Sequence, residues 1–170
     1  MKLTRRAALF VTASAIPALG FAFSASAAGT TITVSLWDKG GDSMDMMGTV
    51  KPMGMGMMGA DMTMAMMGVK ADVTTVPAGE VTFEVTITSK DFIHEMVVSP
   101  VADPTVALPY IQDEEKVDED AAGHVGEVAE LDPGAKGALT VTLTPGTYIL
   151  YCNIPGHYIS GMWTTITVTG

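Results

Sequence analysis

Short segments in which apolar and polar side chains alternate recur along the chain, and they constrain its fold more than any other feature. In segment 81–88, every second residue from Val81 to Ile87 is apolar. Successive side chains of a strand point to opposite faces, so this alternation predicts strands with one buried face. The same pattern occurs in segments 30–37, 92–98, 139–144, 148–152 and 162–168. Turns rich in Pro and Gly separate these segments, and no stretch is convincingly helical, which predicts an all-β sandwich.

The first 27 residues have the features of a cleaved export signal. A twin arginine, Arg5-Arg6, precedes a mildly apolar stretch, and residues 25–27 (Ala-Ser-Ala) form a small-residue cleavage site. The pattern resembles a twin-arginine signal, although the ordinary secretion route stays open. An uncleaved membrane anchor is the alternative. We expect cleavage before Ala28, a periplasmic mature protein, and no membrane span after cleavage.

The remaining chain divides into two parts by composition. Residues 28–68 contain the first predicted strand and a segment, 44–67, in which 11 of 24 residues are Met. Residues 69–170 carry the other predicted strands. Thioethers are soft ligands that suit Cu(I), but flexible Met side chains also pack well over apolar surfaces. Both interpretations of the Met-rich segment stay open.

The chain is strongly acidic, with a formal net charge of -10 at pH 7. This charge argues against binding to nucleic acid or to an anionic membrane surface, and it favours a basic protein partner or cations. A run of acidic residues spans Asp113–Asp120. Such a run is usually a solvated face, but it could also steer a basic partner toward the protein.

The single cysteine, Cys152, lies in a loop with two other soft or borderline metal ligands. His157 follows five residues later and Met162 five residues after that. The alternation in the flanking strands places Cys152 and Met162 on inward-facing positions. His94, on an apolar face about sixty residues upstream, is the natural fourth ligand. Two histidines, a thiolate and a thioether suit copper better than zinc or iron. Each residue alone could be core filler; His124 has no such context, and we expect it in a solvated loop.

The loop resembles the ligand loop of the cupredoxins, the group that includes plastocyanin, azurin and sulfocyanin. The resemblance is carried by Cys-x4-His-x4-Met in the sequence YCNIPGHYISGMW, and by LDPG and LTPGTY upstream, and it covers about residues 69–170. It implies an antiparallel Greek-key β-sandwich with one type 1 copper ion bound by His94, Cys152, His157 and Met162. In many members an Asn that pins the loops follows the upstream histidine, whereas here Glu95 does.

The resemblance also implies a role in electron transfer. In the family the loop histidine presents a ring edge to solvent through an apolar patch, which here assigns an electron port to His157, ringed by Ile154, Pro155, Tyr158 and Ile159. No open coordination position is expected, so we do not expect an enzyme, and the sequence lacks the signatures of a multicopper oxidase or nitrite reductase.

Two functions therefore remain open, besides a non-metal structural sandwich. The first is a monomeric one-electron carrier that exchanges electrons with a redox protein such as a basic cytochrome or reductase. The second, favoured by a similarity to bacterial copper-tolerance cupredoxins, is a copper-binding protein that sequesters or delivers Cu(I) through its Met-rich segment, together with other copper-handling proteins.

Overall fold

The computed structural model describes residues 29–41, 43 and 51–170. The predicted export signal, its cleavage site and the first part of the Met-rich segment, 44–50, lie outside these residues. No helix in the part that is described is long and apolar enough to cross a membrane.

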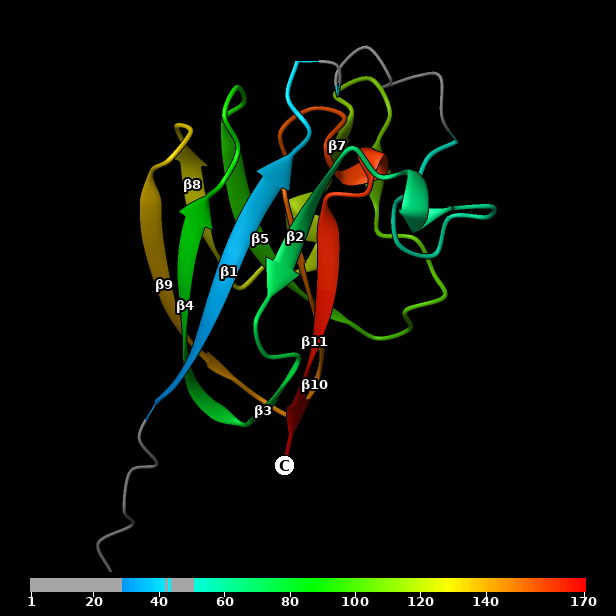
Figure 1. Cartoon of the computed structure of the whole chain (residues 1–170). Coiled ribbons are helices and arrows are strands. Elements are labelled where there is room, and N and C mark those ends of the chain that lie inside the picture. Colours follow the sequence, from blue (N-terminus) through cyan, green and yellow to red (C-terminus); the bar gives the residue numbers. More distant parts are fainter. Residues whose placement is uncertain (1–28, 42, 44–50) are drawn as a thin grey trace, which may run out of the picture.

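Two β-sheets pack face to face as a sandwich (Figure 1). One sheet has the strand order β2-β1-β4-β9 and the other has the order β3-β11-β10-β5-β8. The strands of the first sheet are β1 (Thr30–Asp38), β2 (Met67–Ala71), β4 (Gly79–Ile87) and β9 (Lys136–Leu143). Those of the second are β3 (Thr75–Pro77), β5 (His94–Val101), β8 (Gly126–Leu131), β10 (Gly146–Tyr151) and β11 (Trp163–Thr169). The all-β sandwich predicted from the alternating segments is confirmed.

The strand pairing is mostly antiparallel, with two parallel exceptions. Strand β1 runs parallel to β4 with Ile32 opposite Phe83, and β3 runs parallel to β11. Parallel neighbours need a crossover between them, and the long stretch between β1 and β4 provides one. Strand β1 is thereby built into the middle of its sheet.

The core between the sheets is formed by the inward residues of the alternating segments. Ile32, Leu36, Phe83 and Ile166 are among its fully or almost fully buried members, and Cys152 belongs to the same cluster. Leu139 and Val141 on the edge strand β9 are only partly buried and pack against it. The period of two therefore identified the buried face correctly.

The second sheet is buried on both faces where β5 and β10 run. Val97, Ile149 and Tyr151 point away from the main core, yet they form a second buried cluster with Met55 and Tyr158. Residues 51–66 and the loops of the 101–122 region cover this outer face. The segment with the strongest compositional bias thus serves partly as packing material.

Helical structure is confined to short pieces among the described residues. These are the 3-10 turns η1 (Met62–Met64) and η2 (Tyr158–Ser160), and the one-turn helix α2 (Glu119–Ala122). Helix α2 begins at the end of the acidic run, where Asp118 caps its start, and Gly123 ends it in the left-handed conformation. A small hairpin of β6 (Tyr110–Ile111) and β7 (Lys116–Val117) precedes it.

Candidate metal centre

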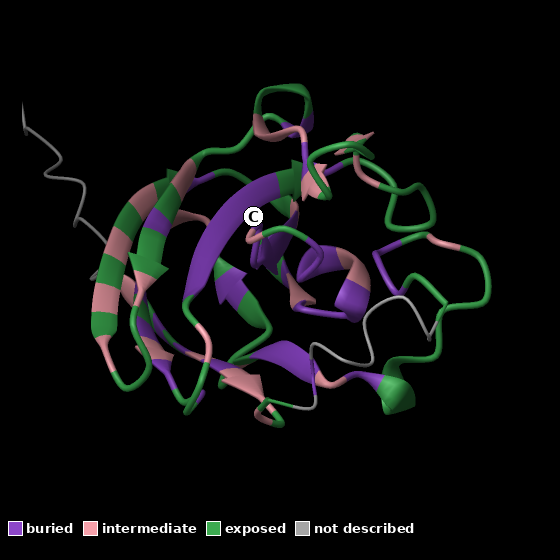
Figure 2. Ribbon diagram, turned by 90° about the horizontal axis from the view of Figure 1, so that it is seen from above, coloured by how far each residue is buried: buried purple, intermediate pink, exposed green. Residues whose placement is uncertain are grey.

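The four predicted ligands lie at one end of the sandwich, at the ends of three adjacent strands and in the loop between two of them. His94 begins β5, Cys152 directly follows β10, and Met162 directly precedes β11, while His157 lies in the loop between the last two. The Cys152 N–H donates to the carbonyl of Met162 at 3.0 Å, and the Met162 N–H donates to the carbonyl of His157 at 3.1 Å. These bonds close the ligand loop tightly. Figure 2, which looks onto this end, shows buried ribbon enclosed by exposed loops.

The structure brings three donor atoms together. His94 Nδ1 and His157 Nδ1 lie 3.2 Å apart, and Cys152 Sγ lies 3.4 Å from His157 Nδ1 and 3.9 Å from His94 Nδ1. Metal–nitrogen bonds of about 2.0 Å and metal–sulfur bonds of about 2.3 Å hold the ligands of one ion roughly 3–4 Å apart. The observed spacing therefore fits a single ion with little rearrangement of the side chains.

Met162 completes the set from the same buried cluster as Cys152, and it has no solvent exposure. The ligand types match the preference of copper for two imidazoles and a thiolate with a weak axial thioether. The coordination of copper by these four side chains stays a prediction. His124 lies in an exposed loop, away from the cluster, as expected for a residue outside the site.

The electrostatic environment keeps both histidines neutral. Burial, together with repulsion by a charged His94, lowers the pKa of His157 to about 4, although the negative charge of Asp38 opposes this shift. Burial also lowers the pKa of His94, although the neighbouring carboxylate of Asp38 opposes this effect. Neutral imidazoles are the form that binds a metal, so both side chains are ready as ligands at neutral pH.

Cys152 is different, because burial raises the pKa of its thiol to about 12. Backbone N–H groups of Glu95 and Ile154 act against this increase by donating toward the sulfur. A metal ligand must be the thiolate, so loading of a cation at this site releases the thiol proton. Two backbone donors are already in place to stabilise the resulting charge.

The strand that carries His94 is irregular at this point. The pairing of β5 with β8 shifts by one residue between His94 and Met96, which is the signature of a β-bulge. The extra residue lies on β8, since the two-residue step from His94 to Met96 is opposite the three-residue step from Leu131 to Val128. Both faces of β5 are covered, so His94, Glu95 and Met96 are all buried in succession. The bulge lies beside Glu95, directly after the predicted ligand His94.

The sequence departure at Glu95 produces a buried carboxyl group. Its Oε1 atom has no hydrogen-bond partner among the described residues. Burial raises the pKa of Glu95 to about 7, and the negative charges of Glu130 and Glu119 contribute. Glu95 therefore cannot act as the loop-pinning amide that the family often has at this position.

Asn153 pins the ligand loop instead, a role that the sequence analysis did not assign. Its Oδ1 accepts the Val117 N–H at 2.7 Å, and its Nδ2 donates to the Val117 carbonyl at 3.0 Å and to Glu119 Oε1 at 2.7 Å. The Gly156 N–H also donates to the carbonyl of Glu115 at 2.8 Å. The ligand loop is thus tied to hairpin β6-β7 and to α2. The sequence signal available for this role was that Asn153 directly follows the predicted ligand Cys152.

Asp38 is a second residue that the sequence analysis missed. Its Oδ2 lies 3.0 Å from His94 Nε2, and neither side chain is exposed to solvent. Burial acts to raise the pKa of Asp38, but hydrogen bonds from Ser89, His94 and Gly40 outweigh it and lower the pKa. Asp38 lies 56 residues from His94 at the end of β1, so no local motif could have linked the two.

The Met-rich segment covers the other side of the ligand loop. The Met53 N–H donates to the carbonyl of Ile159 at 2.6 Å, and Trp163 Nε1 donates to the carbonyl of Met53 at 2.7 Å. Tyr158 lies beneath this cover, and its hydroxyl donates to the carbonyl of Met55 at 3.5 Å. The loop is therefore held from both sides.

This cover changes the predicted electron port. Ile154, Pro155 and Ile159 reach the surface, whereas Tyr158 has no solvent exposure and packs against Tyr110 and Tyr151. The inclusion of Tyr158 in the exposed ring was wrong, because the Met-rich segment buries that side chain. His157 itself is only 2% exposed.

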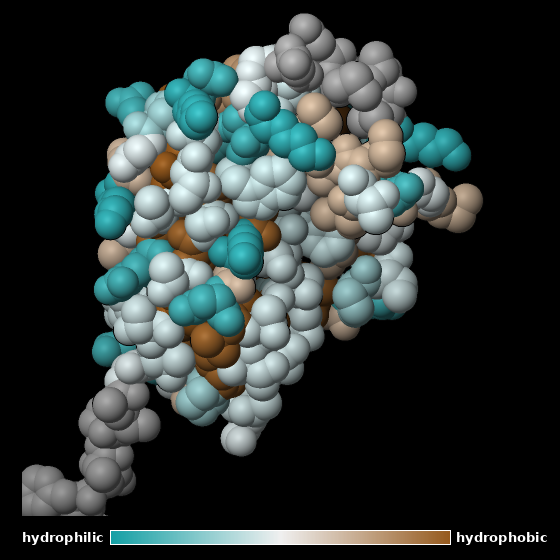
Figure 3. Space-filling view, in the orientation of Figure 1, coloured by the Kyte–Doolittle hydropathy of each residue, from teal (hydrophilic) through white to brown (hydrophobic). Residues whose placement is uncertain are grey.

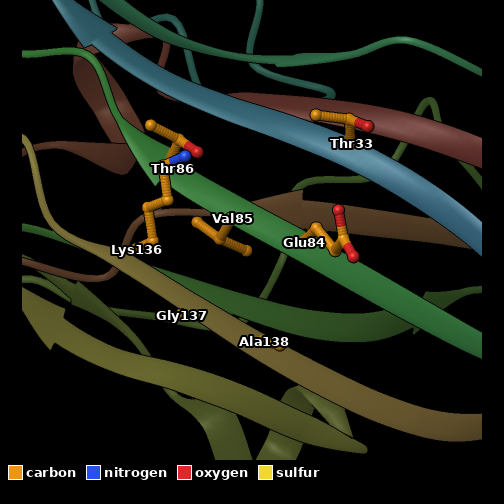
Figure 4. A pocket seen from close by; sticks show the side chains of 7 residues that line it. All are labelled: Thr33, Glu84, Val85, Thr86, Lys136, Gly137 and Ala138. Atoms are coloured by element: carbon orange, nitrogen blue, oxygen red, sulfur yellow. The ribbon is translucent and has the colours of Figure 1, made fainter.

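A surface hollow on the four-stranded sheet is separate from the predicted metal centre. A shallow hollow of about 420 Å³ lies over β1, β4 and β9 and is lined by Thr33, Glu84, Val85, Thr86, Lys136, Gly137 and Ala138 (Figure 4). It contains none of the four predicted ligands, and it offers no cysteine, histidine or methionine.

Fold and site together define a class, a β-sandwich metalloprotein with a buried His/Cys/His centre at one end. Comparison with known proteins gives the family. The family described as copper binding proteins, plastocyanin/azurin family, matches residues 55–169, well over half of the chain. The protein therefore belongs to this family and is a cupredoxin.

Individual relatives agree with this assignment. Auracyanin-B of Chloroflexus aurantiacus is 50% identical over 42 residues, which are 24% of this chain and only 18% of that protein. An auracyanin B structure superposes with a TM-score of 0.51 at 20% identity, covering 86% of this chain and 94% of the other. A rusticyanin structure from Thiobacillus ferrooxidans gives 0.50 at 20% identity, covering 83% and 79%. At this identity the two structures show the shared fold alone.

Replacement of Asn153 by Ala is expected to destabilise the metal-free protein by about 1–3 kcal/mol, because it leaves buried backbone groups of Val117 without a partner. Urea unfolding measures the change. Thr140→Ala is the control, since the Thr140 hydroxyl bonds that of Thr82 on an exposed face, and a change below about 0.5 kcal/mol is expected there. Equal stability of the wild type and the Asn153 variant would contradict the pinning role.

Proposed function

We propose that this cupredoxin is a one-electron carrier with a single type 1 copper ion, and that it is not an enzyme. His94, Cys152 and His157 are the equatorial ligands in this proposal, and Met162 is the weak axial ligand. The observation that carries the proposal is the convergence of three buried donor atoms at spacings that fit one ion. When bound, copper supplies the Cu(II)/Cu(I) couple.

The rigidity of the ligand set supports electron transfer. The ligand loop is hydrogen-bonded on one side to β7 and Glu115, and on the other side to the Met-rich segment. Packed, hydrogen-bonded ligands move little when the charge of the centre changes, and a small rearrangement favours fast electron exchange. Because the donors are buried, a partner would exchange an electron with the centre through the surrounding protein, without direct contact.

The location proposed for the mature protein is the periplasm. This proposal depends on the export signal expected at residues 1–27, with its twin arginine and small-residue cleavage site. A single cysteine fits an oxidising compartment when a metal occupies the thiol. We also propose that the mature protein acts as a monomer.

Cu(II) loading of the wild-type protein is expected to produce intense visible absorption from thiolate-to-copper charge transfer. Cys152→Ser removes the thiolate and is expected to abolish this band completely. His124→Ala is the matched control, because His124 is exposed and lies outside the donor cluster, and its spectrum is expected to equal that of the wild type. A colourless wild-type protein with all four ligands intact would overturn the proposed function.

We also propose that the partner is a basic redox protein, such as a cytochrome or reductase, which docks beside the acidic run. The run lies against the ligand loop through the Gly156–Glu115 and Asn153–Glu119 hydrogen bonds. Glu115 has a positive φ of 53°, which is rare for a residue other than glycine, and its carbonyl receives the Gly156 N–H. These contacts between the acidic run and the ligand loop support the proposal.

Reversal of charge in this run is expected to slow electron exchange with a basic cytochrome. Asp113→Lys with Glu114→Lys should lower the second-order rate constant roughly 10-fold or more at low salt, and the difference should shrink as ionic strength rises. Stopped-flow absorption measures the rate. Glu80→Lys with Glu84→Lys, at two exposed positions of β4, is the control with the same change in net charge. Equal slowing by both changes would show that only net charge matters.

A second function, binding of additional Cu(I), is favoured by the difference in solvent exposure among the methionines of the Met-rich segment. Met53 and Met55 are buried, whereas Met58, Met62 and Met64 are 96%, 41% and 50% exposed. Met53 and Met64 line a common hollow of about 170 Å³. Figure 3 shows hydrophobic residues exposed at the upper right, where Figure 1 draws this segment. Two thioethers that line one hollow, one of them exposed, are suitable ligands for Cu(I).

The Cys152→Ser variant isolates this second site, because its type 1 centre is disabled. In that background we expect about one Cu(I) per chain in anaerobic competition with a chromophoric chelator. Met53→Leu with Met64→Leu, the two methionines that line the hollow, is expected to remove it, while Met58→Leu, outside the hollow, should retain it. Point substitutions are preferable to deletion, because the segment supports the ligand loop. Unchanged copper content in the double variant would exclude the second function.

A further inference from the structure

A buried carboxylate faces the outer nitrogen of one candidate ligand. Asp38 ends β1 in the four-stranded sheet, whereas His94 begins β5 in the facing sheet. The Asp38 Oδ2 atom lies 3.0 Å from His94 Nε2, and both side chains are excluded from solvent. The contact therefore bridges the two sheets immediately behind the donor cluster. Carboxylate groups that accept from metal-binding histidines fix their orientation and tune the metal.

The carboxylate is held in place independently of the histidine. Its Oδ1 atom accepts the Gly40 N–H at 2.7 Å, so the turn after β1 fixes the rotation of the side chain. Gly40 has a φ of +93°, a conformation that favours glycine. The turn itself is anchored, since the Lys39 N–H donates to the carbonyl of Met66 at 2.8 Å. The Asp38 carboxylate is thus preorganised to accept a hydrogen bond from His94.

The contact decides which nitrogen of His94 is available. When Nε2 carries the proton and donates to Asp38, the lone pair lies on Nδ1, which faces Cys152 Sγ and His157 Nδ1. His157 has no comparable carboxylate partner among the residues that the structure describes; its ring contacts are those of Nδ1 with His94 and Cys152. The two histidines are therefore inequivalent.

We propose that Asp38 is a positioning residue of the metal centre, which fixes His94 as the Nε2–H tautomer and lowers the reduction potential through its negative charge. The expected effect on the reduction potential rests on the proposed function, whereas the expected tautomer of His94 concerns the metal-free protein. The oxidised centre is more positive than the reduced one, so a nearby negative charge stabilises the oxidised form. The same hydrogen bond strengthens metal binding by holding the ring in place.

Two substitutions separate charge from hydrogen bonding. Asp38→Asn keeps an oxygen that can accept from Nε2 but removes the charge, and Asp38→Ala removes both. Asp72→Asn is the control, because the Asp72 carboxylate likewise accepts a backbone N–H, that of Thr33 in β1, but at an exposed position. We expect a higher potential in both Asp38 variants. Copper loss to a chelator should be roughly 10–100-fold faster in Asp38→Ala and less affected in Asp38→Asn.

The metal-free protein provides an independent measurement. Nitrogen-15 NMR of the wild type is expected to show His94 as the Nε2–H tautomer, and Asp38→Ala should shift it toward a mixture. An unchanged tautomer together with an unchanged potential and copper release in Asp38→Ala would overturn the inference. If wild-type protein fails to form a type 1 centre, the proposed function fails, and the tautomer result still decides the role of Asp38.

Discussion

The order of three neighbouring strands is the constraint on which the rest of this structure depends. Strand β10 lies between β5 and β11, so the end of β10, the start of β5 and the start of β11 meet at one edge of the sandwich. Cys152, His94 and Met162 occupy these positions. The eleven-residue connection from β10 to β11 then places His157 beside them. The donor cluster is a direct consequence of this strand order together with one short loop.

Desolvation gives the cluster its chemical character. Burial holds the imidazoles neutral and the thiol protonated when no cation is present. A cation that enters meets two ready nitrogen ligands, and it must displace a single proton from sulfur. The backbone donors at Glu95 and Ile154 then stabilise the thiolate. The protein thus offsets the cost of a buried charge with hydrogen bonds that already exist.

The surroundings of the ligand loop are built from parts with unusual composition. The acidic run contributes the hairpin and short helix that hold Asn153 and Gly156, while the Met-rich segment lies over Tyr158 and Trp163. Both regions therefore have a structural role besides any role in binding. The Met-rich segment in particular combines packing by Met53 and Met55 with exposure of Met58 and Met62, so its two interpretations are not exclusive.

The sequence by itself determined the all-β class, the buried face of most strands and the candidate ligands. Alternation at a period of two reports burial directly, and His157 and Met162 are close to Cys152 in the chain, so local spacing was sufficient for them. The tertiary structure alone decided the contacts between distant segments. Three features depend on how sheets and loops pack: the contact of Asp38 with His94, the hydrogen bonds of Asn153 with Val117, and the burial of Tyr158. A one-dimensional pattern does not contain that information. The bulge beside Glu95 is likewise set by the pairing of β5 with β8, which follows from the complete fold.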